Sequence, residues 1–198
     1  MQKEELIRNL RNYKFPETII QAFEKVEREK FIPEENRRQA YEDIPLPIGY
    51  GATISQPYTI AFMLKHLKVK DRQKILEVGS GSGYALALLS ELSPNGKIFG
   101  IERIKELVES SQEKLKDYSN VKIIYGDGSK GLPEEAPLER ILVSAASDKV
   151  PKKLVEQLDL NGIMVIPIRN SIVVLTKTKE GNKIEEYSGF RFVPLIEE

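Results

Sequence analysis

Cysteine is absent from this sequence of 198 residues, and histidine occurs once, at His66. The absence of cysteine excludes disulfide bonds, thiolate metal sites and cysteine nucleophiles. A single histidine also argues against a histidine-based catalytic triad and against a metal site built from several histidines. We therefore expect no metal centre.

An excess of charge of one sign and long apolar runs are missing as well. The 30 basic and 30 acidic side chains cancel, which argues against a polyanion-binding surface and so against a nucleic-acid partner. No apolar stretch reaches the roughly 20 residues that a membrane span requires, and "MQKEELIRNL" at the N-terminus resembles an amphipathic helix rather than a signal peptide. The sequence predicts a soluble, cytoplasmic protein without a membrane partner, and we expect a monomer.

The length of the chain suits one hydrophobic core and is too short for two independent domains, so residues 1–198 are predicted to form one domain. In residues 1–57, Leu6 and Leu10 have helical spacing, and a segment rich in proline and glycine follows. Residues 58–198 form the second part. We expect N-terminal helices and a substrate loop in the first part, and an α/β core with C-terminal strands in the second.

Strand and helix patterns alternate from about Thr59 onward. The strand patterns "KILEVG", "GKIFGIE" and "VKIIYGD" are separated by helical patterns such as "YALALLSEL". Such alternation predicts a parallel sheet with right-handed crossovers and helices on both faces. Two late apolar runs, "SIVVLTKTK" and "FRFVPL", have no helix between them. We therefore predict an α/β, Rossmann-like doubly wound fold with a mostly parallel sheet, an antiparallel element at its C-terminal edge and an N-terminal helical extension.

The clearest chemical motif is "LEVGSGSGY", residues 76–84, which follows a predicted strand and opens a predicted helix. This context is typical of a nucleotide-binding glycine loop. Gly79, Gly81 and Gly83 are spaced Gly-x-Gly-x-Gly, and Tyr84 stands where a dinucleotide fingerprint has its last glycine, which argues against NAD and FAD. The Gly-Lys-Ser/Thr ending of a P-loop is absent, so no triphosphate is expected.

Acidic residues accompany the ends of three successive predicted strands. Glu77 precedes the glycines, Glu102 has the spacing of an acid that binds ribose hydroxyls, and Asp127 lies beside Gly128 in a turn. An acidic pocket without a lysine suits a nucleoside that carries positive charge, such as S-adenosylmethionine. The set resembles the cofactor site of class I S-adenosylmethionine-dependent methyltransferases. Ordinary turns are the alternative, above all for Asp127.

The residues after the fourth predicted strand reduce the number of chemical groups that can serve as the methyl acceptor. The sequence "VSAASDKVP" lacks the Asn/Asp-Pro-Pro-aromatic motif of amino-group methyltransferases, and no cysteine is available for cytosine C5 chemistry. The acceptor therefore needs no proton removed by the enzyme, and a carboxylate, with a pKa of about 4, meets this condition. Catalysis can then depend on alignment of the oxygen nucleophile and on removal of its water.

The segment "PLPIGYGATISQP", residues 45–57, is more specific than the glycine motif. With "GDGS" and "FRFVPL" it resembles the protein-L-isoaspartate (D-aspartate) O-methyltransferase family over almost the whole chain, in family order. The resemblance implies methyl transfer from S-adenosylmethionine to the free carboxylate of L-isoaspartyl, and possibly D-aspartyl, residues in damaged proteins. The methyl ester then converts through a succinimide to aspartate, so that the outcome is repair.

The resemblance also implies roles for single residues. In that family the loop closes over substrate and cofactor, and its serine, here Ser55, engages the isoaspartyl carboxylate as the catalytic residue. Thr53 and Ile54 support it, and Arg191 in the C-terminal segment approaches the same carboxylate. The predicted cofactor-binding residues are Glu77, Gly79, Ser80, Gly81, Gly83, Glu102, Asp127 and Gly128.

Some positions depart from the family pattern or have a second interpretation. Ser80 and Ser144 stand where threonine is more common, and Asp148 is unusual. A carboxylate beside an anionic substrate would repel it, so we expect Asp148 to point away. Ser55 has a structural alternative as the N-cap of the helix that follows it, and both roles can coexist. Tyr84 suits the cofactor pocket and apolar packing equally.

Two other functions stay open from the residues. One is methylation of RNA or of a small molecule, which the neutral charge disfavours for RNA. The other is a non-catalytic module that binds S-adenosylmethionine, which the intact Ser55 loop disfavours.

Overall fold

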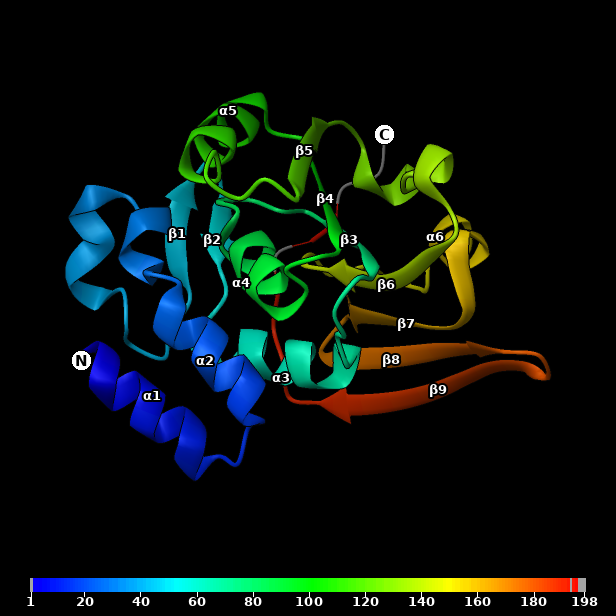
Figure 1. Ribbon diagram of the computed structural model, residues 1–198, viewed down its shortest axis with the longest axis horizontal. Coiled ribbons are helices and arrows are strands. Elements are labelled where there is room, and N and C mark those ends of the chain that lie inside the picture. The colour runs from blue at the N-terminus through cyan, green and yellow to red at the C-terminus, as the bar shows by residue number, and fades with distance from the viewer. Residues whose placement is uncertain (1, 193, 196–198) are drawn as a thin grey trace.

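The computed structural model describes residues 2–192, 194 and 195 (Figure 1). Within this part of the chain, one sheet has seven strands in the order β5-β4-β3-β6-β7-β8-β9. Strands β3 to β7 are mutually parallel, and β8 and β9 are antiparallel to their neighbours. The strands are β3 Lys74–Val78, β4 Lys97–Glu102, β5 Val121–Tyr125, β6 Leu138–Val143, β7 Leu158–Ile168, β8 Ser171–Thr178 and β9 Gly181–Ser188. The predicted fold class, with its antiparallel edge, is confirmed.

The residues before the sheet form helices and a small hairpin. α1 and α2 bury apolar residues at helical spacing, among them Leu6, Leu10 and Phe23. The elements are α1 Lys3–Asn12, α2 Glu17–Lys25, the 3-10 helices η1 Arg28–Phe31 and η2 Glu34–Gln39, and the strands β1 Leu46–Gly49 and β2 Ala52–Ile54. In Figure 1 they lie together on the left, whereas the β8–β9 hairpin extends to the right. The N-terminal helical extension is therefore present, and the boundary at residue 57 stays a prediction.

Both faces of the sheet carry an apolar cluster, because successive residues of a strand point to opposite faces. Ile75 belongs to a cluster that includes residues of α1 to α5. Its neighbour Leu76 belongs to the second cluster, with Leu154 of α6. The remaining helices are α3 Pro57–Leu67, α4 Tyr84–Leu92, α5 Lys105–Lys114, η3 Gly128–Lys130, η4 Pro133–Glu135 and α6 Lys152–Gln157. Central strands buried on both sides read as continuous apolar runs, as "KILEV" does.

The strand order reverses direction at β3. β4 and β5 lie on one side of β3, and β6 and β7 lie on the other. The crevice at the carboxyl ends of strands at such a switch point is the usual ligand site of open α/β sheets. Gly79 follows β3 and Ser144 follows β6, so both residues stand at this crevice. None of the helices among the described residues is long and apolar enough to cross a membrane.

The last strand differs from the prediction. Beyond β8 lies a further antiparallel strand, β9, with the polar sequence "GNKIEEYS". The described residues of "FRFVPL" form no strand and contribute only an isolated bridge from Pro194 to Ala146. Most residues of β9 are exposed, so it lacks the apolar alternation by which a strand is recognised. The predicted antiparallel element is β8, which contains the apolar run "SIVVLTKT" and pairs antiparallel with β7, whereas the second apolar run, "FRFVPL", is not one of the strands of the sheet.

Candidate active site

The glycine motif forms the turn between β3 and α4. Gly79, Gly81 and Gly83 have φ angles of 77°, 51° and 86°, in the left-handed region that glycine adopts without steric cost. The backbone N–H groups of Gly79 and Ser80 donate to the carbonyl oxygen of Ile101, at 2.8 and 3.1 Å. The turn is thereby held against the end of β4, and its open side faces the crevice.

Three cavities meet at this edge of the sheet. The largest, of about 300 Å³, lies over the glycine turn and the end of β4. A narrow cavity of about 50 Å³ lies between the turn and the start of α3. A third, of about 230 Å³, is lined by the end of the β1–β2 hairpin, the start of α3 and the C-terminal segment. Thr53 and Ser144 line all three. We call these the cofactor, connecting and acceptor cavities.

Glu102 lines the cofactor cavity and is fixed by the backbone. Its side chain is buried, Oε2 accepts from the N–H of Gly81 at 2.9 Å, and Oε1 accepts from the N–H of Ile104 at 3.0 Å. A carboxylate oxygen can accept two hydrogen bonds, so both oxygens retain capacity for a ligand. This arrangement joins the glycine turn to the acid at the end of β4 and suits two adjacent hydroxyl groups of a ribose.

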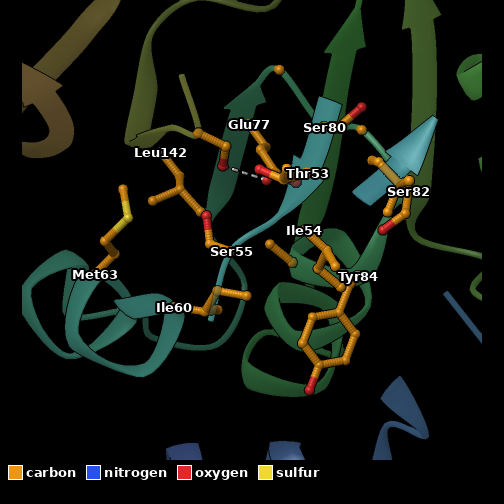
Figure 2. A pocket seen from close by; sticks show the side chains of 15 residues that line it. Thr53, Ile54, Ser55, Ile60, Met63, Glu77, Ser80, Ser82, Tyr84 and Leu142 are labelled. Atoms are coloured by element: carbon orange, nitrogen blue, oxygen red, sulfur yellow. Dashed lines mark hydrogen bonds between the residues drawn. The ribbon is translucent and has the colours of Figure 1, made fainter. Parts of the chain in front are cut away.

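Glu77 and Ser80 present polar atoms that lack partners. Oε2 of Glu77 and Oγ of Ser80 are buried without a hydrogen-bond partner in the described part of the chain. Both residues line the connecting cavity, where Figure 2 shows them with Thr53 and Ser55. Unpaired buried polar atoms are costly, and they are rare in folded proteins unless a ligand or water satisfies them. They therefore fit a ligand that carries hydrogen-bond donors.

The electrostatics of Glu77 are unusual. Burial raises the pKa of its carboxyl group to about 8, the hydrogen bond from Ser144 opposes this shift, and the charge of Glu102 adds to it. The Ser144 hydroxyl lies 2.7 Å from Oε1 of Glu77. A cationic ligand group beside Glu77 would favour the ionised carboxylate.

The other predicted cofactor residues occupy different positions. Gly79, Gly81 and Gly128 line the cofactor cavity. Gly83 is the N-cap of α4 and packs on α5 and the residue after it, since an added Cβ would lie 2.7 Å from a methyl group of Leu115. Asp127 caps η3, where its Oδ1 accepts from the N–H of Ser129 at 2.9 Å. Of the predicted set, these two residues lie outside the described cavity linings.

The β1–β2 hairpin and the C-terminal segment supply the acceptor cavity. Thr53, Ser55 and Arg191 line it, and Ser55 also lines the connecting cavity. Ile54 is buried and lies on the connecting side. The structure therefore brings Thr53, Ser55 and Arg191 together at the acceptor cavity, with Ile54 beside them in the lining of the connecting cavity. Asp148 is exposed, and the described linings of the three cavities do not include it.

Ser55 does not cap α3. The N-cap residue is Gln56, which makes no side-chain cap bond. The cap comes from Asp43, whose Oδ1 accepts from the N–H of Tyr58 at 2.8 Å. The structural interpretation of Ser55 as an N-cap was therefore wrong. Ser55 instead lines the connecting and acceptor cavities. Tyr84 is 1% exposed and packs against Phe23 and Phe31, in addition to lining the connecting cavity.

Ser144, which lines all three cavities, and Asp43, which holds the start of α3 from outside the described linings, were not among the predicted site residues. Ser144 was noted only as a replacement for threonine, and Asp43 carried no motif. Ser144 could have been found from its place, because it directly follows the strand beyond the switch point. The role of Asp43 depends on a contact between residues far apart in the sequence, and no local pattern reports it.

The order of the strands, the glycine turn after β3 and the acid at the end of β4 define a class I S-adenosylmethionine-dependent methyltransferase. The family model described as "Protein-L-isoaspartate(D-aspartate) O-methyltransferase (PCMT)" matches residues 1–198. The chain belongs to this family. It is thus an enzyme that uses S-adenosylmethionine to methylate isoaspartyl residues, as the sequence predicted.

Curated relatives and solved structures agree with this assignment. Protein-L-isoaspartate O-methyltransferase of Ignicoccus hospitalis is 47% identical over 99% of this chain and 98% of its own length, and that of Fervidobacterium nodosum is 46% identical over 96% and 99%. A Plasmodium falciparum structure described as this methyltransferase, in complex with S-adenosyl-L-homocysteine, is 28% identical, covers both chains fully and has a TM-score of 0.88.

Proposed function

We propose that the acceptor cavity binds the isoaspartyl carboxylate and that Ser55 is the catalytic residue that orients it. Thr53 and Ile54 shape the same end of the loop, and Arg191 offers a positive charge to the carboxylate. The observation that carries this proposal is that Ser55 lines both the acceptor and the connecting cavity. A carboxylate oxygen held by Ser55 would face the connecting cavity, which is lined by the glycine turn.

The cofactor end is assigned on the same basis. We assign Glu77, Gly79, Ser80, Gly81, Glu102 and Gly128 to contact with S-adenosylmethionine, and Gly83 and Asp127 to the support of that site. Glu102 suits the ribose hydroxyls, and the unpaired Oε2 of Glu77 suits a cationic or hydrogen-bond-donating group. When bound, S-adenosylmethionine supplies an electrophilic methyl group.

The chemistry of this chain is alignment and desolvation. The acceptor carboxylate is ionised at neutral pH, so no general base is needed. The hydroxyl groups of Thr53 and Ser55 replace water around the carboxylate and hold one oxygen toward the connecting cavity. The backbone nitrogen of the following residue then attacks the carbonyl carbon of the ester, and the methoxyl group leaves with the N–H proton as methanol. The resulting succinimide hydrolyses in part to aspartate. Acceptance of D-aspartyl sites follows the same chemistry.

A labelled methyl transfer assay tests the proposal. A synthetic peptide with one isoaspartate should take label from S-adenosylmethionine, and the same peptide with normal aspartate should not. Ser55→Ala should lower kcat/KM by about 10- to 100-fold, because the carboxylate loses an orienting donor. Ser55→Thr is the matched control, since it keeps a hydroxyl group. Wild-type kinetics in Ser55→Ala would remove Ser55 from the catalytic role.

The remaining features stay proposals. We propose a cytoplasmic monomer that does not act on nucleic acid, and the balanced charge supports the last point. Transfer of label to tRNA but not to the isoaspartyl peptide would contradict the proposed substrate.

A further inference from the structure

Arg28 is a charged side chain in the interior, with an exposed fraction of 0%. Its Nε donates to the carbonyl oxygen of Ala40 at 2.8 Å, and one terminal nitrogen, Nη2, donates to the carbonyl oxygen of Ser55 at 2.9 Å. The guanidinium carbon lies 5.0 Å from the ring centre of Tyr84. The groups around this buried charge thus include two carbonyl oxygens, the ring of Tyr84 and the negative charge of Asp43.

The two hydrogen bonds of Arg28 go to the ends of one segment. Residues 40 and 55 are the two ends of the segment that contains the β1–β2 hairpin and Thr53. The guanidinium group therefore holds the two ends of this segment together. Tyr84, on the other side of the guanidinium, directly follows the glycine turn.

Burial of a charged guanidinium group carries a large desolvation cost. Its second terminal nitrogen, Nη1, has no hydrogen-bond partner in the described part of the chain. Apolar residues of similar volume are often as stabilising as a buried charge or more so. Packing alone does not explain an arginine at this position. The hydrogen bonds from its guanidinium group to the carbonyl oxygens of Ala40 and Ser55 explain it better.

We propose that Arg28 is a positioning residue for methyl transfer, which fixes the backbone of Ser55 so that the hydroxyl group of Ser55 faces the acceptor and connecting cavities. This inference rests on the proposed role of Ser55. Arg28 acts on the substrate side, because its hydrogen bonds go to the two ends of the loop and it is outside the described lining of the cofactor cavity.

The chemistry of the fork predicts how substitutions behave. Arg28→Met keeps the length of the stem and removes both donors and the charge. Arg28→Lys keeps the charge, but a single ammonium group cannot reproduce the two directions of a guanidinium fork. A misplacement of about 1 Å at a reacting group can cost about 100-fold in rate. We expect kcat/KM for the isoaspartyl peptide to fall about 10- to 100-fold in Arg28→Met and less in Arg28→Lys.

The experiment compares these variants with Leu154→Ala, a buried substitution on the opposite face of the sheet. Each protein is assayed at a temperature at which circular dichroism shows it folded, and its affinity for S-adenosylhomocysteine is measured by calorimetry. The inference expects a loss of kcat/KM with a cofactor affinity within about threefold of wild type. If Arg28 were merely structural, its variants would also bind the cofactor more weakly, or Leu154→Ala would lose as much kcat/KM as they do. Either result would overturn the inference. Failure of both Arg28 variants to fold would also overturn it.

A double-mutant cycle with Ser55→Ala completes the test. If Arg28 acts through Ser55, Arg28→Met should cost much less in the Ser55→Ala background than in wild type. Equal costs in both backgrounds would contradict the inference while leaving the proposed function intact. An inactive wild type would instead contradict the proposed function.

Discussion

The hydroxyl group of Ser144 donates a hydrogen bond of 2.7 Å to Oε1 of Glu77, and so joins the carboxyl ends of β6 and β3 across the switch point of the sheet. Glu77 is 2% exposed, and burial raises its pKa to about 8. Without a ligand, this carboxyl group is therefore mostly protonated at neutral pH.

Glu77 should make the unliganded protein less stable as the pH rises. The folded-state pKa of about 8 exceeds the reference value of 4.5, so the folded state holds the proton more tightly than the unfolded chain. The contribution is fully present below about pH 4.5 and is lost as the pH rises through about 8. Urea unfolding across this range should show a steeper loss of unfolding free energy in wild type than in Glu77→Gln, by a few kcal/mol at about 1.4 kcal/mol per pKa unit. Identical profiles would contradict the assignment.

Cofactor binding should release this proton. S-adenosylhomocysteine carries an ammonium group, and a positive charge near Glu77 favours its ionised form. Calorimetric titrations at about pH 7 in two buffers of different ionisation enthalpy should therefore give different binding enthalpies, with protons passing to the buffer. In Glu77→Gln the two buffers should agree. Buffer-independent binding by the wild type would place the charged group of the ligand elsewhere.

The parts of the site that could be predicted from the sequence are those carried by local chemistry. Gly79, Gly81 and Gly83 predict a turn with left-handed backbone. The number of residues between these glycines and Glu102 predicts that Glu102 is the acid that binds the ribose. The structure brings these positions to one sheet edge because parallel strands place their carboxyl ends together. The fold was predictable for the same reason, since each central strand is a distinct apolar run.

Other parts depend on contacts between distant segments. Arg28 lies in a charged stretch, "EREKF", where nothing in the sequence separates it from a solvated arginine, yet it is buried. Asp43 caps a helix that starts many residues later. β9 is a polar edge strand whose pairing with β8 is defined by backbone hydrogen bonds, and these leave no trace in the side-chain pattern.

Gly83→Ala should destabilise the protein even though Gly83 lies outside the described lining of the cofactor cavity. Its φ of 86° disfavours any residue with a Cβ, and that Cβ would lie 2.7 Å from Leu115. We expect a loss of about 1–3 kcal/mol in the free energy of unfolding, measured with urea. Gly126→Ala is the matched control, because its backbone is not left-handed and its nearest neighbour is 4.0 Å away. Equal losses in the two variants would refute the steric explanation.

Arg191→Ala should raise the KM for the isoaspartyl peptide and leave the affinity for S-adenosylhomocysteine unchanged. Arg191 is exposed and lines the acceptor cavity, and it is outside the described lining of the cofactor cavity, so we expect its charge to act on the substrate. An exposed charge of this kind is partly screened, and we expect an increase of about 3- to 10-fold that shrinks at high salt. Arg191→Lys keeps the charge and should retain most of the affinity. A change in kcat with an unaltered KM would argue that Arg191 does not bind the ground-state carboxylate.

Asp43→Ala should loosen the start of α3 and, with it, Ser55. Oδ1 of Asp43 accepts a 2.8 Å hydrogen bond from the N–H of Tyr58, and this is the side-chain cap of a helix whose own N-cap, Gln56, makes none. Loss of a helix cap costs about 1 kcal/mol, and hydrogen exchange at the amide of Tyr58 should accelerate. Because Ser55 stands two residues before the first helical residue, kcat/KM for the isoaspartyl peptide should fall several-fold while cofactor affinity is kept. Asp43→Asn retains an acceptor oxygen and should behave much more like wild type. If Asn and Ala lower stability and activity equally, the negative charge of Asp43 rather than the capping bond holds the loop in place.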